Sequence, residues 1–223
     1  HYIFKFKLFL ITYLQYSLQY FTMKIILVRH CETEWNKEER CQGISDTELN
    51  STGFKQAELL KEYFLNQKID FVFSSNLKRA QQTLDKINFD NRFKVNYSED
   101  LREMNQGDFE GLSLSHLRKE YSEELKIWRE NPEEFRLPNG ETLGEVQERV
   151  WLFMKNLVNN YSMSSKVLVV THNLVIACLL CMIEGKQLKF FSNYTTDSGA
   201  ISIVSFKDNI FSGELINFTE HLR

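Results

Sequence analysis

The sequence predicts an α/β protein, a three-layer αβα sandwich with a mostly parallel central sheet. From Met23 onward, short apolar runs alternate with segments whose apolar residues recur at helical spacing. Such alternation of strands and helices places helices on both faces of a parallel sheet. The run KVLVV at 166–170 supports this, because a nearly continuous apolar strand is typical of a sheet centre covered on both faces.

The first part of the chain is expected to contain three strands and two helices. The strands are predicted at 25–28, at 71–74 and, with a weaker pattern, at 93–97. The helices are predicted at 50–67 and 76–87, where apolar residues return every three or four positions. Their expected buried positions are Phe54, Ala57, Leu60 or Leu59, Phe64, Leu77, Ala80, Leu84 and Ile87.

The second part of the chain begins with a polar tract. We interpret residues 105–140 as an insertion that holds one short helix near 115–121. The closing hairpin should add antiparallel strands to the sheet. The elements expected after the insertion are a long helix at 140–161, a central strand at 166–172, a buried helix at 173–183 and a hairpin at 199–218 with its turn near 207–209.

Length and composition are those of an ordinary globular chain. The 223 residues are 43% hydrophobic, which suits one core, so we expect a single domain over 23–223. The net charge of −3 argues against a broad nucleic-acid-binding surface. Cys178 and Cys181 have redox or metal spacing, but they lie inside the apolar run LVIACLLCMI, which favours buried thiols.

The first 22 residues differ from the rest of the chain. They are rich in aromatic residues, and Lys5 and Lys7 interrupt their apolar runs, so the segment falls short of a membrane span. No clear cleavage site for a secretory signal precedes Met23. We expect residues 1–22 to be a non-native or weakly ordered extension, and the protein to be cytoplasmic, with no membrane partner. Whether the protein forms a homodimer is left open.

Charged residues follow the predicted strands where each one ends. Arg29 and His30 end the first strand, Arg79 lies in the first turn after the second, and His172 ends the strand KVLVV. Glu103 follows another strand-like segment. Each residue alone has an ordinary structural explanation. Ligands of doubly wound sheets, however, bind outside the carboxyl ends of the strands, so neighbouring strands would bring all five to one crevice.

Two histidines, two arginines and a carboxylate allow two kinds of site. Two histidines and a carboxylate can bind a metal, but two permanently charged guanidinium groups would repel the cation. Arginines instead suit a phosphate, which they bind through paired, charge-assisted hydrogen bonds. The backbone N–H groups of the helix that starts at Asn173 could contact the same oxygens. This set favours metal-free phosphoryl transfer through a phosphohistidine, with no cofactor.

The same residues carry a family resemblance. The stretch LVRHCETEWNKEERCQGISDTELNSTGFKQA resembles the opening signature of the histidine phosphatase superfamily, also called phosphoglycerate mutase-like. The blocks SSNLKRAQQT, LREMNQGDFEG, GET and VVTHN match later parts of that signature in order. The resemblance spans about residues 24–206, and five ordered blocks are far more specific than one motif. It implies a phosphoglycerate mutase-like fold.

The resemblance implies a role for each residue of the predicted crevice. His30 would be the nucleophile, and Arg29, Arg79 and His172 would stabilise the transferring phosphoryl group. Glu103 would protonate the leaving oxygen and then activate water. The residues expected to line the phosphate or substrate pocket are Thr33, Asn36, Gln42, Gly43 and Asn173.

The sequence departs from the family pattern at three positions. Cys31 replaces the glycine that usually follows the nucleophile, which puts the fine geometry or the rate in doubt. Glu48 stands where proline is frequent. Asn173 replaces a second glycine, and asparagine tolerates unusual backbone angles better than most residues. Cys31 itself is a poor candidate for the nucleophile.

The compact tract after Glu103 resembles the phosphatase branch, including α-ribazole phosphatase-like and broad-specificity enzymes. The implied function is a metal-independent phosphomonoesterase that acts on a small phosphorylated metabolite. A bisphosphoglycerate-dependent phosphoglycerate mutase and a catalytically silent phospho-ligand-binding protein are the alternatives. Trp128, Phe135 and Arg136 are candidates for contact with the organic part of the substrate, although packing on the core is the favoured reading for them.

Overall fold

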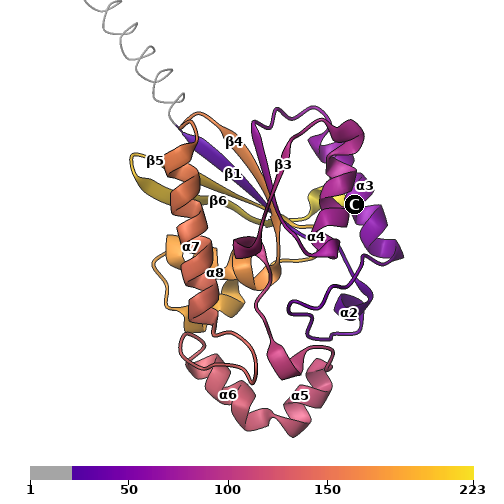
Figure 1. The fold of residues 1–223 in the computed structure, drawn as a ribbon, viewed down its shortest axis with the longest axis vertical. Helices are drawn as coiled ribbons and strands as arrows, with labels where there is room; N and C mark the ends of the chain where they lie inside the picture. The colour runs from indigo at the N-terminus through magenta and orange to yellow at the C-terminus, as the bar shows by residue number, and fades with distance from the viewer. Residues whose placement is uncertain (1–21) are drawn as a thin grey trace, which may run out of the picture.

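The fold is built on one six-stranded sheet, which the computed structural model describes within residues 22–223 (Figure 1). The strand order is β3-β2-β4-β1-β5-β6. β1, β2, β3 and β4 run parallel, β5 is antiparallel to β1, and β6 is antiparallel to β5. The predicted α/β fold class is therefore confirmed. The strands are β1 (Met23–Arg29), β2 (Phe71–Ser75), β3 (Val95–Ser98), β4 (Lys166–Thr171), β5 (Ile201–Lys207) and β6 (Ile210–Phe218).

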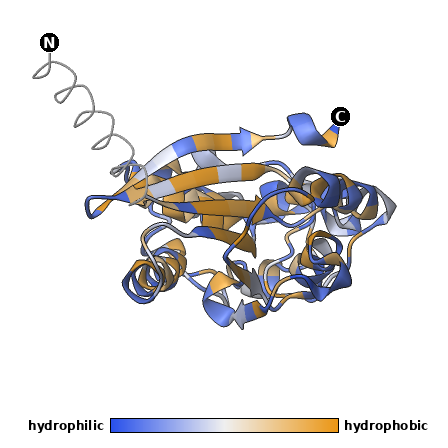
Figure 2. Cartoon of the chain, turned by 90° about the horizontal axis from the view of Figure 1, so that it is seen from above, coloured by the Kyte–Doolittle hydropathy of each residue, from blue (hydrophilic) through white to orange (hydrophobic). Residues whose placement is uncertain are grey.

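Helices cover both faces of the sheet and form a core on each side. On one face, the cluster of α3 and α4 with the sheet contains Ala57, Leu60, Phe64, Leu84 and Ile87. On the other face, α7 and α8 pack on the sheet. Apolar residues accordingly concentrate in the strands between the helical layers (Figure 2). The helices are α2 (Glu34–Lys37), α3 (Ser51–Phe64), α4 (Lys78–Ile87), α5 (Leu114–Glu120), α6 (Ser122–Glu130), α7 (Leu143–Asn160) and α8 (Asn173–Ile183). Short 3₁₀ turns include η2 (Glu99–Leu101), η3 (Gly107–Phe109) and η4 (Leu188–Tyr194).

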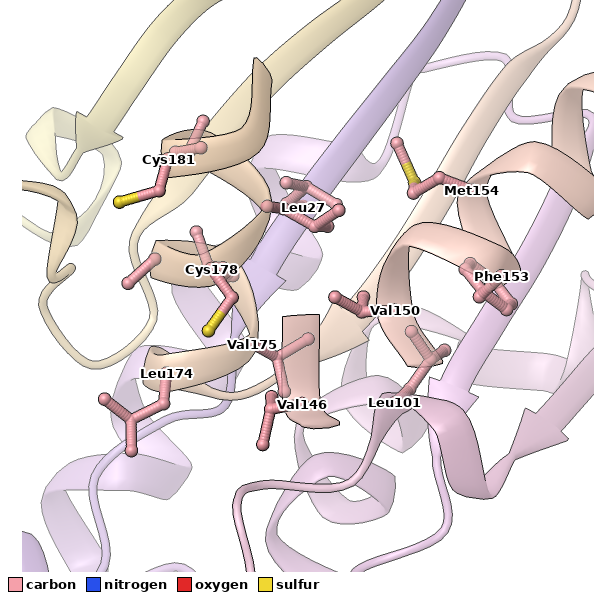
Figure 3. Close-up of a cluster of buried hydrophobic side chains, with 14 of the residues drawn as sticks. Leu27, Leu101, Val146, Val150, Phe153, Met154, Leu174, Val175, Cys178 and Cys181 are labelled. Atoms are coloured by element: carbon pink, nitrogen blue, oxygen red, sulfur yellow. The ribbon is translucent and has the colours of Figure 1, made fainter. Parts of the chain in front are cut away.

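The helix α7 shows how the sequence fixes an element. Thr142 and Glu145 form a capping box, in which Thr142 Oγ1 accepts from the Glu145 N–H at 3.1 Å and Glu145 Oε2 accepts from the Thr142 N–H at 2.9 Å. Val146, Val150 and Met154 follow at helical spacing and are fully buried against the sheet and α8 (Figure 3). The capping box therefore defines where α7 begins, and the stripe of apolar residues defines which of its faces is buried.

The buried cysteines belong to the same core. Cys178 and Cys181 lie on α8, both side chains are buried, and both thiols are free (Figure 3). Burial raises the pKa of each thiol, to about 11 for Cys181. The prediction of buried thiols is confirmed.

Two details of the sequence analysis were wrong. Phe54 is 39% exposed, because Gly53 takes the buried place where α3 meets the backbone of Glu32. A Cβ at Gly53 would lie 2.0 Å from the Glu32 carbonyl oxygen, so this approach requires glycine. The insertion contains two helices, α5 and α6, where one was expected. The α6 helix has a largely charged surface and no fully buried residue, which hid its periodicity.

The predictions for residues 1–22 fall almost entirely outside the described part of the chain. The single-domain assignment for 23–223 likewise stays a prediction. Within residues 22–223, no helix is both long enough and apolar enough to cross a membrane.

Candidate active site

The carboxyl ends of the parallel strands bring four of the five predicted catalytic residues to one cavity, and the fifth, His172, is buried beside His30 and does not line it. Arg29 pairs with Thr171 across the parallel β1 and β4 strands, so the next residues, His30 and His172, emerge side by side. Their ring centroids are 5.1 Å apart. The cavity is about 340 Å³, a size suited to a small metabolite. The predicted catalytic residues that line it are Arg29, His30, Arg79 and Glu103.

His30 is a buried, neutral imidazole with one free ring nitrogen. Its Nδ1 lies 2.8 Å from the carbonyl oxygen of Cys31, which can only accept, so we assign the proton to Nδ1. Burial, followed by the positive charges of Arg79 and Arg29, holds the pKa of His30 well below its ordinary value. The Nε2 lone pair is therefore available to attack an electrophile at neutral pH.

His172 lies behind His30 and is fully buried at the start of α8. Its Nε2 is 2.8 Å from the hydroxyl oxygen of Ser75, at the end of β2. Its Nδ1 is buried and has no hydrogen-bond partner among the described residues. Burial and the positive charge of Arg79 lower its pKa well below the ordinary value, so this imidazole is neutral as well.

Arg79 is fully buried and Arg29 is partly buried, and neither forms an ion pair with a carboxylate in the described chain. Arg79 donates to the carbonyl oxygens of Ser45 at 2.8 Å and Gly43 at 2.7 Å. Burial lowers its pKa to about 10, so it stays charged at neutral pH. Arg29 donates to the carbonyl oxygen of Thr196. The Nε of each guanidinium is buried and unpaired among residues 22–223, which leaves donors and positive charge for an anion.

Glu103 lines the same cavity as these arginines, and its carboxylate lies at the start of α8. Its Oε1 accepts from the Met104 N–H at 3.0 Å, and its Oε2 accepts from the Leu174 N–H at 3.4 Å. Burial raises the pKa of Glu103, and these hydrogen bonds and Arg79 only partly oppose that rise. Arg149 of α7 donates to the Glu103 carbonyl oxygen at 3.2 Å and fixes the backbone there. A carboxyl in this setting can hold and release a proton.

The expected pocket residues form a connected rim. Thr33 and Asn36 make a capping box at the start of α2, and Thr33 donates from its hydroxyl to Gln42 Oε1 at 3.0 Å. Asn173 Oδ1 accepts from the N–H of Thr196, whose carbonyl accepts from Arg29. The rim residues that line the cavity are Asn36, Gln42, Gly43 and Asn173, whereas Thr33 is buried beneath them.

The residues that depart from the family pattern are accommodated. The Cys31 side chain is buried outside the cavity lining, and its sulfur lies 3.5 Å from where a Cβ on Gly199 would be. Burial raises its pKa to about 12, so the thiol stays protonated and is a poor nucleophile. Glu48 is at the surface and forms an ion pair with Lys78 at 3.3 Å.

Sequence reasoning missed Glu110, which holds the loop beneath Arg79. Its carboxylate accepts from the backbone N–H groups of Ile44 at 2.8 Å, Ser45 at 2.9 Å and Gln106 at 3.2 Å. The same loop carries the Gly43 and Ser45 carbonyls that accept from Arg79. Gly43 has a φ of +54°, and a Cβ there would collide with the Glu110 carboxylate. A lone carboxylate in a polar tract carries no periodic signal from which this role could be predicted.

Of the candidates in the insertion, only Trp128 reaches the cavity. Trp128 lines it from α6. Phe135 packs against the core cluster of α7 and α8, and Arg136 forms an ion pair with Glu145. The favoured interpretation, packing on the core, fits both Phe135 and Trp128, and Trp128 lines the cavity as well.

Comparison with known proteins identifies the family of the chain. Residues 25–219 match the model of the histidine phosphatase superfamily (branch 1). The chain is 30% identical over 200 residues to phosphoserine phosphatase 1 of Hydrogenobacter thermophilus, covering 90% of this chain and 94% of that protein. It is 35% identical over 169 residues to a phosphoglycerate mutase of Schizosaccharomyces pombe, covering 72% and 79%.

Solved structures of related proteins have the same fold as this chain. An α-ribazole phosphatase from Shigella flexneri superposes with a TM-score of 0.78 at 27% identity, covering 88% of this chain and 96% of that one. The predicted enzyme class, a phosphatase, is confirmed by these relatives. The chain belongs to the histidine phosphatase superfamily, branch 1.

Proposed function

We propose that the protein hydrolyses a small phosphomonoester through a phosphohistidine formed on His30. The observation that carries this is the neutral, buried His30, whose free Nε2 faces a cavity lined by Arg29 and Arg79. Both guanidiniums lack a carboxylate partner among the described residues and keep unpaired donors. A dianionic phosphate satisfies both, and its phosphorus then lies open to in-line attack.

In the first step, His30 Nε2 attacks phosphorus and the bond to the ester oxygen breaks. Arg29, Arg79 and His172 stabilise the negative charge on the transferring phosphoryl oxygens. Glu103 gives its proton to the leaving oxygen, which prevents the release of an unstable alkoxide. The raised pKa of Glu103 supports this role, because the carboxyl keeps its proton until the step needs it.

In the second step, water attacks the phosphohistidine. Glu103, now ionised, takes a proton from the water, the N–P bond breaks, and inorganic phosphate and neutral His30 are restored. In this scheme the phosphate pocket is lined by Asn36, Gln42, Gly43 and Asn173. Thr33 holds Gln42 and Asn36 in place through its hydrogen bonds to them. The N-terminal N–H groups of α8 add favourable dipoles.

A mutase is the second candidate, since one relative is a phosphoglycerate mutase. A mutase returns the phosphoryl group to a second hydroxyl, whereas a phosphatase passes it to water. Phosphoglycerate isomerisation that depends on a bisphosphate primer would decide for the mutase. A silent phospho-ligand-binding protein would bind phosphate without forming a phosphoenzyme. We favour hydrolysis of a cytoplasmic metabolite.

The test is turnover of p-nitrophenyl phosphate and sugar phosphates by the wild type and by His30→Ala at mildly acid pH. Loss of the nucleophile should reduce kcat by at least about a thousandfold. His116→Ala, an exposed histidine on α5, is the matched control and should keep full activity. Turnover by His30→Ala close to that of the wild type would overturn the assignment.

A further inference from the structure

The segment 195–200, between η4 and β5, holds the backbone that carries the proposed nucleophile. The Gly199 N–H donates to the carbonyl oxygens of Arg29 and His30, each at 3.2 Å. The Ala200 carbonyl oxygen accepts from the Arg29 N–H at 3.1 Å. We call residues 195–200 the supporting loop, because a movement of this loop would change the positions of Arg29 and His30.

A histidine that the proposed mechanism does not use is hydrogen-bonded to the supporting loop. His221 lies in the 3₁₀ turn η5 (Glu220–Leu222), beside α3 (Figure 1). Its Nε2 lies 3.0 Å from the carbonyl oxygen of Gly199, which can only accept, so we assign the ring proton to Nε2. His221 Nδ1 is buried and has no hydrogen-bond partner in the described chain. Within residues 22–223, the one hydrogen bond of this ring therefore goes to the supporting loop.

Aromatic packing fixes the orientation of the His221 ring. The ring stacks on Phe218, at the end of β6, with 5.4 Å between centroids and 25° between planes. It also contacts Tyr63 of α3, with 5.2 Å between centroids. Burial lowers the pKa of His221 below its ordinary value, so the ring is neutral at neutral pH and its single proton stays on Nε2. The ring is therefore a fixed donor that is directed at one carbonyl oxygen.

Two neighbours of His221 contact the same loop. The Leu222 methyl carbons lie 3.5 Å from the position that a Cβ on Gly199 would take. Asn217 Oδ1 accepts from the Asp197 N–H at 2.8 Å, and Asn217 Nδ2 donates to the Asp197 carboxylate at 3.0 Å. Within the described chain, however, His221 is the only side chain that hydrogen-bonds to Gly199, the glycine whose N–H supports the nucleophile.

We propose that His221 is a positioning residue for phosphoryl transfer, because its hydrogen bond to Gly199 holds the backbone of Arg29 and His30 in the geometry for in-line attack. The inference rests on the proposed phosphohistidine mechanism. His221 does not line the cavity, so it acts only through the supporting loop. It also lies beyond residues 25–219, the part of the chain that matches the family. A displacement of the reacting atoms by about 1 Å can reduce a rate about a hundredfold, so a small movement of the loop is enough.

The test compares two substitutions of His221. His221→Phe keeps an aromatic ring against Phe218 and Tyr63 but removes the donor, whereas His221→Gln keeps an N–H donor of similar reach. We expect His221→Phe to lower kcat for p-nitrophenyl phosphate about fivefold to thirtyfold, and His221→Gln to recover most of that loss. Both steps of the reaction occur at His30 Nε2, so kcat should fall whichever step is slower. The inhibition constant of inorganic phosphate should change by less than about threefold, because Arg79 is held by a different loop and still binds the anion.

Phe211→Leu is the matched control for stability. Phe211 lies at the other end of β6 and packs on Phe206 and Trp151, so this variant loosens the same β5–β6 pair far along the strand from His221. Phe211→Leu should lose unfolding free energy in urea and keep the kcat of the wild type. An equal loss of kcat in Phe211→Leu and His221→Phe would overturn the inference, because a general loss of stability would explain both.

The two His221 variants must also differ from each other. Equal losses of kcat in His221→Phe and His221→Gln would overturn the inference, because the donor would then be irrelevant, and so would unchanged kcat in both. Urea unfolding checks that each variant is folded under the assay conditions. If His221→Phe does not fold, His221→Leu, which also lacks a donor, makes the same comparison with His221→Gln.

Failure of the proposed function would look different. If turnover by the wild type did not depend on His30, the phosphohistidine proposal would fall and the inference with it. If turnover depended on His30 but did not change in the folded His221 variants, only the role of His221 would be assigned wrongly.

Discussion

At the scale of single residues, chemistry at this site depends on which groups carry protons. In the proposed mechanism, His30 must be neutral to attack, and Glu103 must be protonated to release the alcohol. Burial favours both states, because it lowers the pKa of the histidine and raises that of the carboxyl. In the same proposal, the guanidinium groups of Arg29 and Arg79 bind the phosphate as cations.

These pKa shifts predict the pH dependence of catalysis. On the acid side, kcat/KM should fall when the pH drops well below 6.5, because the pKa of His30 lies well below that ordinary value. It should also fall as the pH rises above the raised pKa of Glu103, whose ordinary value is 4.5. The profile is therefore expected to be bell-shaped, with its acid limb below 6.5 and its alkaline limb above 4.5. A pH–rate profile checks this, and an acid limb centred above 6.5 would contradict it.

Glu103→Gln tests the two-stage role of the carboxyl. Gln cannot transfer a proton, so kcat should fall about 10²- to 10⁴-fold. With p-nitrophenyl phosphate, whose leaving group needs little protonation, the first step should survive and the phosphoenzyme should accumulate. Burst kinetics measure this. Glu99→Gln on the adjacent η2 turn is the control, and a uniform loss in both steps without a burst would count against the role of Glu103.

Cys31→Ala separates packing from catalysis. The thiol is buried, protonated and outside the cavity lining, so the variant should keep kcat and lose about 1 kcal/mol of unfolding free energy. Turnover and urea unfolding measure the two effects. Loss of activity beyond about tenfold in a folded variant would show that Cys31 has a chemical role.

At the scale of elements, loops and helix starts hold the reactive groups. The loop that contains Gly43 and Ser45 fixes Arg79, and Glu110 fixes that loop through the backbone of Ile44 and Ser45. The start of α8 fixes Glu103 through the Leu174 N–H. The active-site geometry is therefore supported by residues that do not line the site themselves.

Glu110→Gln tests this support. One carboxylate oxygen becomes an NH₂ group facing backbone N–H donors, so the loop should shift and the affinity for orthovanadate should fall about tenfold. Because Glu110 acts through Arg79, its effect should largely vanish in an Arg79→Lys background, whereas independent effects add. Glu48→Gln, at the surface of the neighbouring segment, is the control. Full additivity of the two changes would contradict the coupling.

At the scale of the whole molecule, the sheet order explains both what could be predicted and what could not. Strands β2, β4 and β1 are neighbours, so histidines and arginines that follow them share one edge, as their positions in the sequence suggested. Buried apolar runs identify such strands directly. Glu110 and α6 were missed because their roles depend on contacts across loops and on a cavity, and neither leaves a periodic pattern. Phe54 was wrongly predicted to be buried, because α3 packs so closely on the backbone of Glu32 that Gly53 occupies the buried position.

The most direct measurement is capture of the phosphoenzyme. Wild-type protein is mixed with p-nitrophenyl phosphate, quenched in alkali and digested, and the peptides are sequenced by mass spectrometry. We expect one phosphoryl group on His30, stable to alkali and lost on heating in acid, and absent from His30→Ala. A phosphoryl group on any other residue, or active enzyme with no phosphoenzyme at all, would contradict catalysis through His30.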